Sequence, residues 1–435
     1  MRGALLLLSG LVCACGSSTT CKLTAPSKGD GALTQDAELL RDVNGRIVQL
    51  RGVDMGGRSK FAPYAPFDFT DGAYDAALDA YLDRAQAWGV DVARVPFTWE
   101  AIEAVQGQDD EAFLARYDAL IAGLWKRGIR SIIDFHQDIY SQNYCGDGFP
   151  QWTLPMPWPA EHHDCPGWGG GYLMDTEMMH AFDRFWASGS TVQAQYVSLW
   201  QRLATRYANT PGVIGFEPIN EPGWGTADLA GWEAQTLPPF FTSMISTLHA
   251  IAPGKLVFFE GAGSDGIFVQ THLERPEGMG LVFAPHYYQL SYDPSRVAQD
   301  LRYFVGRGRT WHVPVLMGEF GIDSKETVAE DLMRAHWDAL ESLGLHGTQW
   351  EYSTASELWN SEHFSLTEAD GTENVTVKPL VRAYLSALAG SGATATRSDA
   401  QVAWSWTGAK GVSENRGTGA VGAARLRRGG HGRMR

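Results

Sequence analysis

The chain has 435 residues and a formal net charge of −15, with 44% hydrophobic and 20% charged residues. A strongly acidic chain argues against nucleic acid as a partner, and after the first fifteen residues no apolar run is long enough to span a membrane. The length allows a large core, held either by two domains or by one α/β barrel that uses most of the chain.

The amino terminus is typical of an exported protein. Residues 1–15 contain one arginine, a short apolar run and then small residues, as in a secretory signal peptide. Residues 11–16 (LVCACG) resemble a bacterial lipobox in which Cys15 is lipidated. The polar residues 16–38 would then form a flexible tether. We therefore expect an exported protein, either secreted or held at a bacterial cell envelope by a lipidated N-terminus.

Between residues 39 and 389, eight β-rich apolar segments alternate with helical stretches. The expected strands cover residues 46–53, 91–97, 129–135, 213–217, 255–260, 281–288, 313–320 and 346–352. Helical spacing of apolar residues is clearest after the first two strands, where Gly89 and Gly128 mark the expected helix ends. This alternation predicts a parallel α/β architecture.

The segment after the third expected strand, residues 139–185, is too long for an ordinary strand-to-helix loop. It is rich in aromatic residues and methionines: Tyr140, Tyr144, Trp152, Trp158, Trp168, Tyr172, Met174, Met178 and Met179. These side chains would form either a substrate wall or a satellite cluster that covers the barrel, and the position near the catalytic end favours the wall.

The same segment holds two of the five cysteines, Cys145 and Cys165. Export allows them to form a disulfide, which would leave Cys21 unpaired. Residues 162–165 (HHDC) have metal-binding side chains, but their spacing matches no standard zinc pattern, so we expect no metal site.

Two glutamates follow apolar strands that lie about a hundred residues apart. Glu221 lies in the stretch 212–225 (GVIGFEPINEPGWG), and Glu319 follows residues 313–317 (VPVLM). In a parallel α/β barrel the carboxyl ends of the strands carry the chemistry. A pair of carboxyl groups there suits hydrolysis of a glycosidic bond, whereas Glu221 alone would equally suit a helix cap.

Asn-Glu-Pro after one strand and Gly-Glu-Phe-Gly after a later one resemble glycoside hydrolase family 5. The resemblance implies a (β/α)8 TIM barrel with Glu221 as acid/base, Glu319 as nucleophile and no cofactor. Other positions that match the family imply substrate-binding roles for Arg94, His136, Asn220, His286, Tyr288 and Trp350. Arg94 would orient the nucleophile, Asn220 would hydrogen-bond the 2-hydroxyl, and Trp350 would be the sugar platform. Individually, Arg94 would equally suit an internal salt bridge and His286 or Trp350 the core.

Further motifs resemble the endoglycoceramidase branch of that family, whose members cut between an oligosaccharide and ceramide. They are GRIVQLRGVDMGGRSK, RVPFTWEAIE, DFHQDIYSQ and GDGFPQW. In that branch, the residues matching Lys60 and Asp138 contact the sugar, and a C-terminal β-sandwich follows the barrel. Residues 390–435 would be a truncated remnant of that sandwich, with strands within 394–407 and then an Arg/Gly-rich tail that is expected to be disordered.

The resulting expectation is a retaining β-glycoside hydrolase that acts as a monomer on a carbohydrate or glycolipid. For a ceramide substrate, the apolar half of the site would include Trp152, Trp158 and Met178. The alternative enzyme is another β-glucosidase or endoglucanase of the family, acting on glucans or on steryl or alkyl glucosides. The alternative outside enzymology is a glycan-binding surface lipoprotein, against which the intact pair of glutamates argues.

Overall fold

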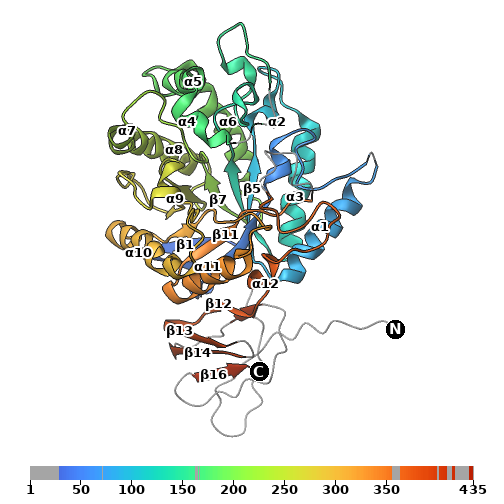
Figure 1. The fold of residues 1–435 in the computed structure, drawn as a ribbon, viewed down its shortest axis with the longest axis vertical. Coiled ribbons are helices and arrows are strands. Elements are labelled where there is room, and N and C mark those ends of the chain that lie inside the picture. The colour runs from blue at the N-terminus through green and yellow to red at the C-terminus, as the bar shows by residue number, and fades with distance from the viewer. Residues whose placement is uncertain are drawn as a thin grey trace.

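A computed structural model describes residues 29–70, 72–161, 165, 167–354, 363–398, 401–408, 414–416 and 431–434. Its centre is an eight-stranded parallel sheet (Figure 1). The strands are β4 (Arg51–Asp54), β5 (Val92–Phe97), β6 (Arg130–Phe135), β7 (Val213–Glu217), β8 (Leu256–Phe259), β9 (Leu281–Phe283), β10 (Leu316–Met317) and β11 (His346–Gln349).

The sheet curls into a barrel. Its order is β10-β11-β4-β5-β6-β7-β8-β9, and parallel bridges from Phe283 to Val315 and from His286 to Glu319 join the two end strands. The helices that connect the strands form the outer layer (Figure 1). They are α1 (Tyr74–Trp88), α2 (Trp99–Glu103), α3 (Glu111–Lys126), α4 (Gly171–Met174), α5 (Thr176–Trp186), α6 (Thr191–Tyr207), α7 (Leu229–Gln235), α8 (Leu237–Ile251), α9 (Ser264–Phe268), α10 (Pro294–Trp311) and α11 (Ala329–Leu343). The (β/α)8 expectation is confirmed.

Local signals explain where these helices begin and end. The Asp110 carboxylate accepts hydrogen bonds from the backbone N–H groups of Ala112 and Phe113 and so caps the start of α3. Gly89 follows α1 with φ of 81°, a left-handed conformation that glycine adopts without a steric penalty. The apolar residues that the sequence places at helical spacing are the ones that face the barrel.

The first expected strand is divided between two sheets. Residues 46–53 form β3 (Ile47–Val48), outside the barrel, and then β4 inside it. The change of partner occurs at Gln49 and Leu50. The Gln49 N–H donates to the Ser386 carbonyl, while the Leu50 N–H donates to Nδ1 of His346, which begins β11. The expectation of one continuous barrel strand was wrong for this reason.

An antiparallel sheet closes the amino end of the barrel. It contains β1 (Leu33–Asp36), β2 (Leu39–Asp42), β3, β12 (Tyr384–Leu388) and β15 (Glu414–Arg416), in that order. Leu33, Leu40 and Val48 are buried in one cluster with residues from the inside of the barrel, such as Ile132 and Phe258. Residues 33–36 are therefore structural, and the expected tether ends earlier than residue 38. Residues 1–28, including Cys15 and Cys21, lie outside the described part of the chain.

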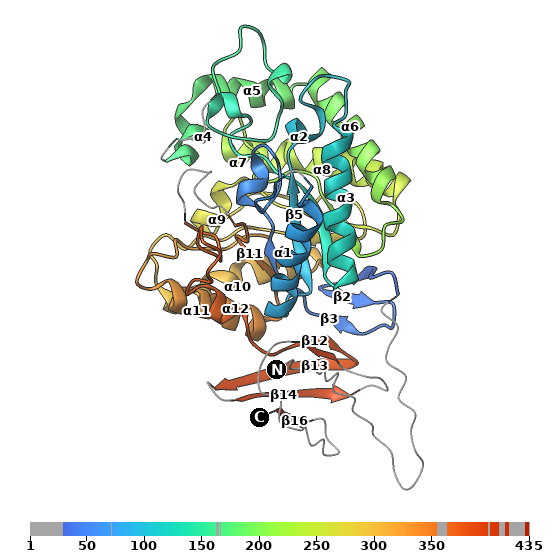
Figure 2. The same ribbon diagram turned by 90° about the vertical axis from the view of Figure 1, so that its right-hand side faces the viewer.

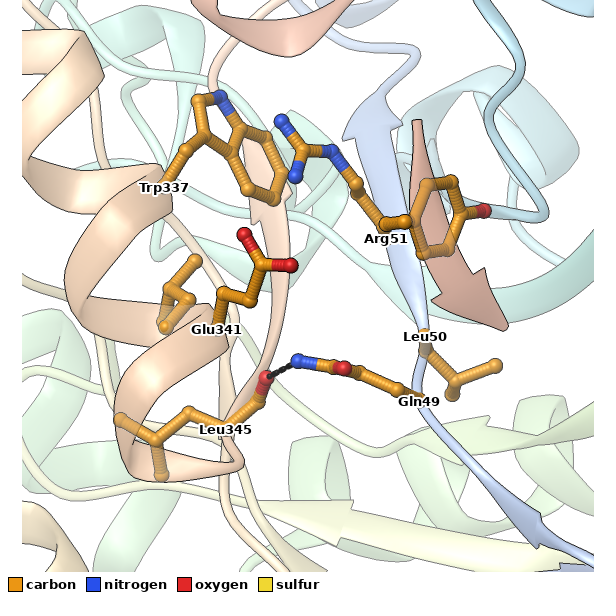
Figure 3. Close-up of a pocket in the computed structure, with 8 residues that line it drawn as sticks. Gln49, Leu50, Arg51, Trp337, Glu341 and Leu345 are labelled. Carbon is orange, nitrogen blue, oxygen red and sulfur yellow. Dashed lines mark hydrogen bonds between the residues drawn. The ribbon is translucent and has the colours of Figure 1, made fainter. Parts of the chain in front are cut away.

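A small pocket lies at the same end of the barrel (Figure 3). Its wall is formed by the Arg51 guanidinium, which stands 4.0 Å from the Trp337 ring and 5.5 Å from the Tyr384 ring. Arg51 also donates to the Pro379 carbonyl at the start of the connection to β12. The helix before that connection is α12 (Val377–Leu380). The pocket thus marks the contact of the barrel with β12.

Beyond residue 389, the described residues form a three-stranded antiparallel sheet. Its strands are β13 (Gly390–Ser398), β14 (Gln401–Gly408) and β16 (His431–Met434). One or two strands were expected within residues 394–407, and the structure has two, which extend beyond this stretch. The last 21 residues were expected to be disordered, but β15 and β16 include six of them. In the described residues we find no helix with the length and apolarity that crossing a membrane requires.

The long segment after β6 contains short helical turns, α4 and α5, and one disulfide. The turns are η2 (Gln142–Tyr144), η3 (Gln151–Thr153) and η4 (Trp168–Gly170). Cys145 and Cys165 are joined, with their Cα atoms 5.9 Å apart. His162, His163 and Asp164 lie outside the described residues.

Candidate active site

The structure brings the two expected catalytic glutamates together at the carboxyl end of the barrel. Glu221 follows β7 and Glu319 follows β10, and the imidazole of His286 lies between them. His286 Nδ1 is 2.8 Å from Glu221 Oε1 and 3.5 Å from Glu319 Oε2. One oxygen of each carboxylate lies within 4.8 Å of the other. Retaining glycosidases separate their carboxyl groups by about 5–5.5 Å and inverting ones by about 6.5–9.5 Å, so this spacing is the retaining one.

Glu319 has the surroundings of an ionised nucleophile. Arg94 Nη1 lies 2.6 Å from one of its oxygens, and the Tyr288 hydroxyl donates to the other at 2.7 Å. Burial alone would raise the pKa of Glu319, but the positive charges of His286 and Arg94 outweigh it and hold the pKa below its ordinary value. The carboxylate is therefore charged and fixed at both oxygens.

Arg94, on β5, is fully buried and is surrounded by acceptors from neighbouring strands. Besides Glu319, it contacts Glu217 at 2.8 Å, Asp54 at 3.2 Å, Asp134 at 3.2 Å and the Asn220 side-chain oxygen at 2.7 Å. Burial would lower the pKa of Arg94, but the charges of Asp134 and Glu217 raise it well above its ordinary value. Arg94 therefore forms internal salt bridges, as one alternative expected, and it also holds the nucleophile Glu319, as the other expected.

Glu221 is held through its backbone in a left-handed conformation, with φ of 39°. Its N–H donates to Glu260 Oε1 at 2.8 Å. Its carbonyl accepts from Gln137 Nε2 at 2.8 Å and from the Tyr172 hydroxyl at 3.0 Å. The side chain is 12% exposed, so a substrate and water can reach a carboxyl group whose direction is fixed.

His286 is the positive centre between the glutamates. Burial would lower its pKa, but the charges of Glu260 and Glu319 and the hydrogen bond to Glu221 raise it to about 10. At neutral pH the ring is therefore an imidazolium that donates to Glu221. Two groups of side chains, Glu217–Glu260–His286 and Glu221–His286–Glu319, are close enough to hold a cation. Metal binding to either group would require His286 to release its proton.

A second group of polar side chains lies on the opposite side of the opening, between β6, β11 and the turn η1 (Gly57–Lys60). The His136 and Trp350 rings stack with centroids 5.2 Å apart, and Lys60 Nζ lies 4.5 Å from the Trp350 ring. Lys60 also forms a buried ion pair with Asp138. The pKa of His136 is raised to about 10, because its hydrogen bonds to Asp134 and Asp138 outweigh burial and the charge of Lys60. The His136, Trp350 and Lys60 side chains are almost fully buried, with Trp350 3% exposed, so little of the ring expected to be the sugar platform is accessible.

The sequence did not single out three residues that position this site. Gln137 and Glu260 hold the Glu221 backbone, and both stand at strand ends, which is the available signal in the sequence. Asp147 is fully buried and pairs with Asp138 through both backbone hydrogen bonds, at 2.9 and 3.3 Å. Burial and the charge of Asp138 raise the pKa of Asp147 well above its ordinary value. This environment favours the protonated form of Asp147.

The expected aromatic wall is mostly structural. Tyr140 and Met178 are buried in the main core, and Trp152 packs against it while its indole N–H donates to the Glu103 carbonyl. Trp158 is 39% exposed. The satellite-cluster alternative therefore describes most of this segment, and Met178 and Trp152 were wrongly expected to face the substrate. The Trp168 side chain lies outside the described part.

Comparison with known proteins decides the family. The family model described as Cellulase (glycosyl hydrolase family 5) matches residues 42–356. The chain belongs to glycosyl hydrolase family 5. Both glutamates of this family 5 chain, and the contacts that fix them, fall within the matched residues.

One relative that the chain resembles in sequence is an endoglycoceramidase. The chain is 27% identical over 333 residues to endoglycoceramidase I of Rhodococcus hoagii, a match that covers 70% of this chain and 65% of that protein. The chain thus spans about two thirds of the length of that relative.

Solved structures show the same fold at low identity. The ganglioside GM3 complex of endo-glycoceramidase II from Rhodococcus sp. matches with a TM-score of 0.73 and 21% identity, over 92% of this chain and 96% of that one. Sterylglucosidase 1 of Cryptococcus neoformans matches with a TM-score of 0.74 and 14% identity, over 93% and 95%. Both neighbours fit equally well, so the fold alone does not select between a ceramide and a sterol.

Proposed function

We propose that this family 5 chain is a retaining β-glycosidase that releases the glycan from glycosphingolipids. The observation that carries the retaining mechanism is the approach of Glu221 and Glu319 to within 4.8 Å, with His286 between them. The ceramide substrate is supported by the name of the Rhodococcus hoagii relative and by the ganglioside bound to a structural neighbour. The buried Lys60–Asp138 pair adds a polar subsite of the kind that the endoglycoceramidase motifs imply.

The reaction has two steps. Glu319 Oε attacks the anomeric carbon, the bond from that carbon to the leaving oxygen breaks, and Glu221 gives its proton to that oxygen. Water then attacks the anomeric carbon of the glycosyl-enzyme, its proton passes to Glu221, and Glu319 leaves as a carboxylate. Arg94 and Tyr288 hold the Glu319 oxygens throughout. The Asn220 amide, fixed by Arg94 and by the Gln137 carbonyl, would bind the 2-hydroxyl.

Three substrates compared side by side test this proposal: detergent-dispersed glycosylceramide, a cello-oligosaccharide and an aryl β-glucoside. We expect free glycan and intact ceramide from the first, with the β-anomer appearing first in NMR spectra. Initial release of the α-anomer would refute the retaining mechanism. Faster cleavage of cello-oligosaccharides would refute the ceramide substrate and favour a general β-glycanase.

A steryl or alkyl glucoside is the second candidate substrate, because the Cryptococcus neoformans neighbour has the same fold. An aryl glucoside that is not cleaved at all would instead favour the glycan-binding lipoprotein.

We also propose, from the sequence alone, that the chain is exported and lipidated at Cys15. In a bacterial host, Cys15→Ser should move the protein from the membrane fraction to the soluble fraction. Unchanged fractionation would contradict lipidation.

A further inference from the structure

Two buried acidic side chains lie behind the acid/base, outside the site described above. They are Glu233 on α7 and Asp265 on α9, which are 0% and 6% exposed. Both approach Gly261, where an added Cβ would lie 2.5 Å from Glu233 Oε1 and 1.9 Å from Asp265 Oδ2. The two oxygens therefore lie close to each other, against the backbone between β8 and α9. The helices α7 and α9 lie on the same side of the barrel in both views (Figure 1 and Figure 2).

Glu233 connects the backbone before α9 to the backbone after it. Its Oε1 accepts the Ala262 N–H at 3.0 Å and the Thr271 hydroxyl at 3.1 Å. Its Oε2 accepts the His272 N–H at 2.8 Å. One buried side chain thus fixes both ends of this short helix.

Asp265 adds a second hold on the same residue. Its N–H donates to the Ala262 carbonyl at 2.9 Å, so the two acids hold Ala262 by its N–H and by its carbonyl. Burial and the neighbouring Glu233 raise the pKa of Asp265 to about 10. At neutral pH Asp265 is therefore uncharged, which allows the two carboxyl groups to share one buried space.

The segment that the two acids hold carries two contacts to Glu221. Glu260, at its start, accepts the Glu221 N–H at 2.8 Å. Gly263, at its end, lies against the side chain, because an added Cβ would stand 2.9 Å from Glu221 Oε2 and 3.1 Å from Glu221 Cδ. Ala262 lies between these contacts, so a shift of the segment would displace both the backbone and the carboxyl group of Glu221.

We propose that Glu233 and Asp265 are positioning residues for the acid/base, and that they act by fixing residues 260–263 against Glu221. This proposal rests on the proposed function, because it assigns their effect to proton transfer by Glu221. A misplacement of about 1 Å at a reacting group can cost about a hundredfold in rate. Lys60 and His136 come from the segments after β4 and β6, so the loss should fall on protonation of the leaving group and leave KM unchanged.

Steady-state kinetics of Glu233→Gln test the proposal. Glutamine keeps the shape of the side chain but cannot accept hydrogen bonds at both ends. For glycosides with poor leaving groups we expect kcat to fall about tenfold with KM within twofold of the wild type. For an activated aryl glucoside, kcat/KM should change less than threefold. Asp265→Asn keeps an uncharged side chain of the same shape and should stay within twofold on both substrates.

Glu103→Gln is the matched control. Glu103 is 6% exposed and accepts the Gly107 N–H at 2.7 Å, so it fixes the segment after α2 instead. Its substitution should change neither substrate more than twofold. An equal loss in Glu103→Gln and Glu233→Gln, or a loss that is the same on both substrate types, would overturn the proposal.

A double variant shows whether the effect passes through the acid/base. Adding Glu233→Gln to Glu221→Gln should cost less than a further twofold, because the group that is positioned is already absent. A further tenfold loss would contradict the proposal. Gly263→Ala is a second route if Glu233→Gln does not fold, since its methyl group would press directly on Glu221 and should reproduce the selective loss. Activity like that of the wild type in Gly263→Ala would overturn the proposal.

Hydrogen exchange provides a measurement that needs no turnover. In a peptide covering residues 219–223, Glu233→Gln should exchange the Glu221 N–H faster than the wild type or Glu103→Gln does, because the acceptor Glu260 is less firmly held. Unchanged exchange would overturn the proposal even in an active enzyme. Failure of the proposed function is seen separately, as a wild type without glycosidase turnover in which Glu233→Gln still accelerates this exchange.

Discussion

Arg94 shows how one residue shapes the chemistry around it. Its guanidinium lies among Glu319, Glu217, Asp54 and Asp134, all of which are buried. A buried charge is tolerated only when it is paired and hydrogen-bonded, so these groups stabilise each other as a set. The set keeps the nucleophile ionised and prevents it from rotating. Arg94, which orients the nucleophile, thus also supplies the positive charge that the surrounding buried carboxyl groups share.

The roles of the two glutamates predict different kinetic losses. Glu319→Gln should abolish turnover of every substrate, because no nucleophile remains. Glu221→Gln should reduce turnover of glycosides with poor leaving groups by about 10²–10⁴-fold. It should affect activated aryl glycosides much less, since their leaving groups need little protonation. Steady-state kinetics on both substrate types would measure this, and equal losses in Glu221→Gln would contradict its role as acid.

The raised pKa of Asp147 predicts that two substitutions at this position change KM to different extents. Asp147→Asn keeps a polar side chain of the same shape and carries no charge, so KM for glycan substrates should change by less than about threefold. Asp147→Leu places a branched apolar side chain against the charged Asp138 and should raise KM by about tenfold. Both variants should unfold at temperatures close to that of the wild type; a large KM change in Asp147→Asn would show that the charge matters.

At the scale of elements, the amino-terminal strands β1, β2 and β3 form one sheet with β12, and this sheet lies at the amino end of the barrel. β12 pairs with β3, and Tyr384, Leu385 and Leu388 are buried beneath it. Arg382, just before β12, forms an ion pair with Asp338 on α11. The strand therefore belongs to the folding unit of the barrel, although it follows the last barrel strand by more than thirty residues.

Truncation separates the contribution of β12 from that of the sheet after it. A chain that ends after Ala389 should fold and cleave aryl glucosides at a rate within about twofold of the full chain. A chain that ends after Val381 loses the five buried residues of β12, and the three large side chains among them, Tyr384, Leu385 and Leu388, are each worth about 1.5–3 kcal/mol. That loss is comparable with the total stability of a domain, so this chain should be insoluble or unfolded. Circular dichroism and thermal melting would measure both, and a stable shorter chain would contradict the role of β12.

At the scale of the whole molecule, the two ends of the barrel differ in exposure. The amino end is sealed by apolar residues of β1, β2 and β3, while the carboxyl end collects charged groups around Arg94 and His286. Titratable side chains are also buried away from the catalytic centre, and these affect the stability of the fold at acid pH. His336 and His346 are the clearest of these, because burial lowers the pKa of each to about 4.

The two histidines predict an acid-dependent loss of stability. The unfolded chain takes up a proton on each near pH 6.5, whereas the folded chain does so only near pH 4, so stability falls as the pH drops from 6.5 to 4. The slope is about 1.4 kcal/mol per pH unit for each histidine. Buried acids with a raised pKa, such as Asp147, make the folded state more stable as the pH falls. The test therefore compares the pH dependence of stability in the wild type with that in a variant that lacks one histidine.

His346→Asn is the matched variant, because the asparagine oxygen can accept the Leu50 N–H in place of Nδ1. Urea unfolding at pH 7 and pH 5 should show that the wild type loses about 2 kcal/mol relative to the variant. Parallel pH dependence of the two proteins would contradict the prediction.

The sequence by itself determined the alternation of strands and helices, the helix end at Gly89, and the positions of Glu221 and Glu319 at strand ends. These features depend on local periodicity, on backbone conformations and on hydrogen bonds between near neighbours, all of which are written in a short stretch of residues. Recognition of the family motifs added the residues around the glutamates.

The tertiary structure decided which partner each side chain meets. Periodicity could not show that Met178 would be buried while Met174 is exposed, because both lie in one aromatic-rich segment and the difference depends on which face meets the barrel. It could not show that residues 33–36 belong to a sheet at the amino end of the barrel. That sheet is completed by β12, which lies more than three hundred residues later in the chain. Nor could it show that Asp147 lies against Asp138, because that pairing forms only when the loop folds back on itself and removes water from both carboxyl groups.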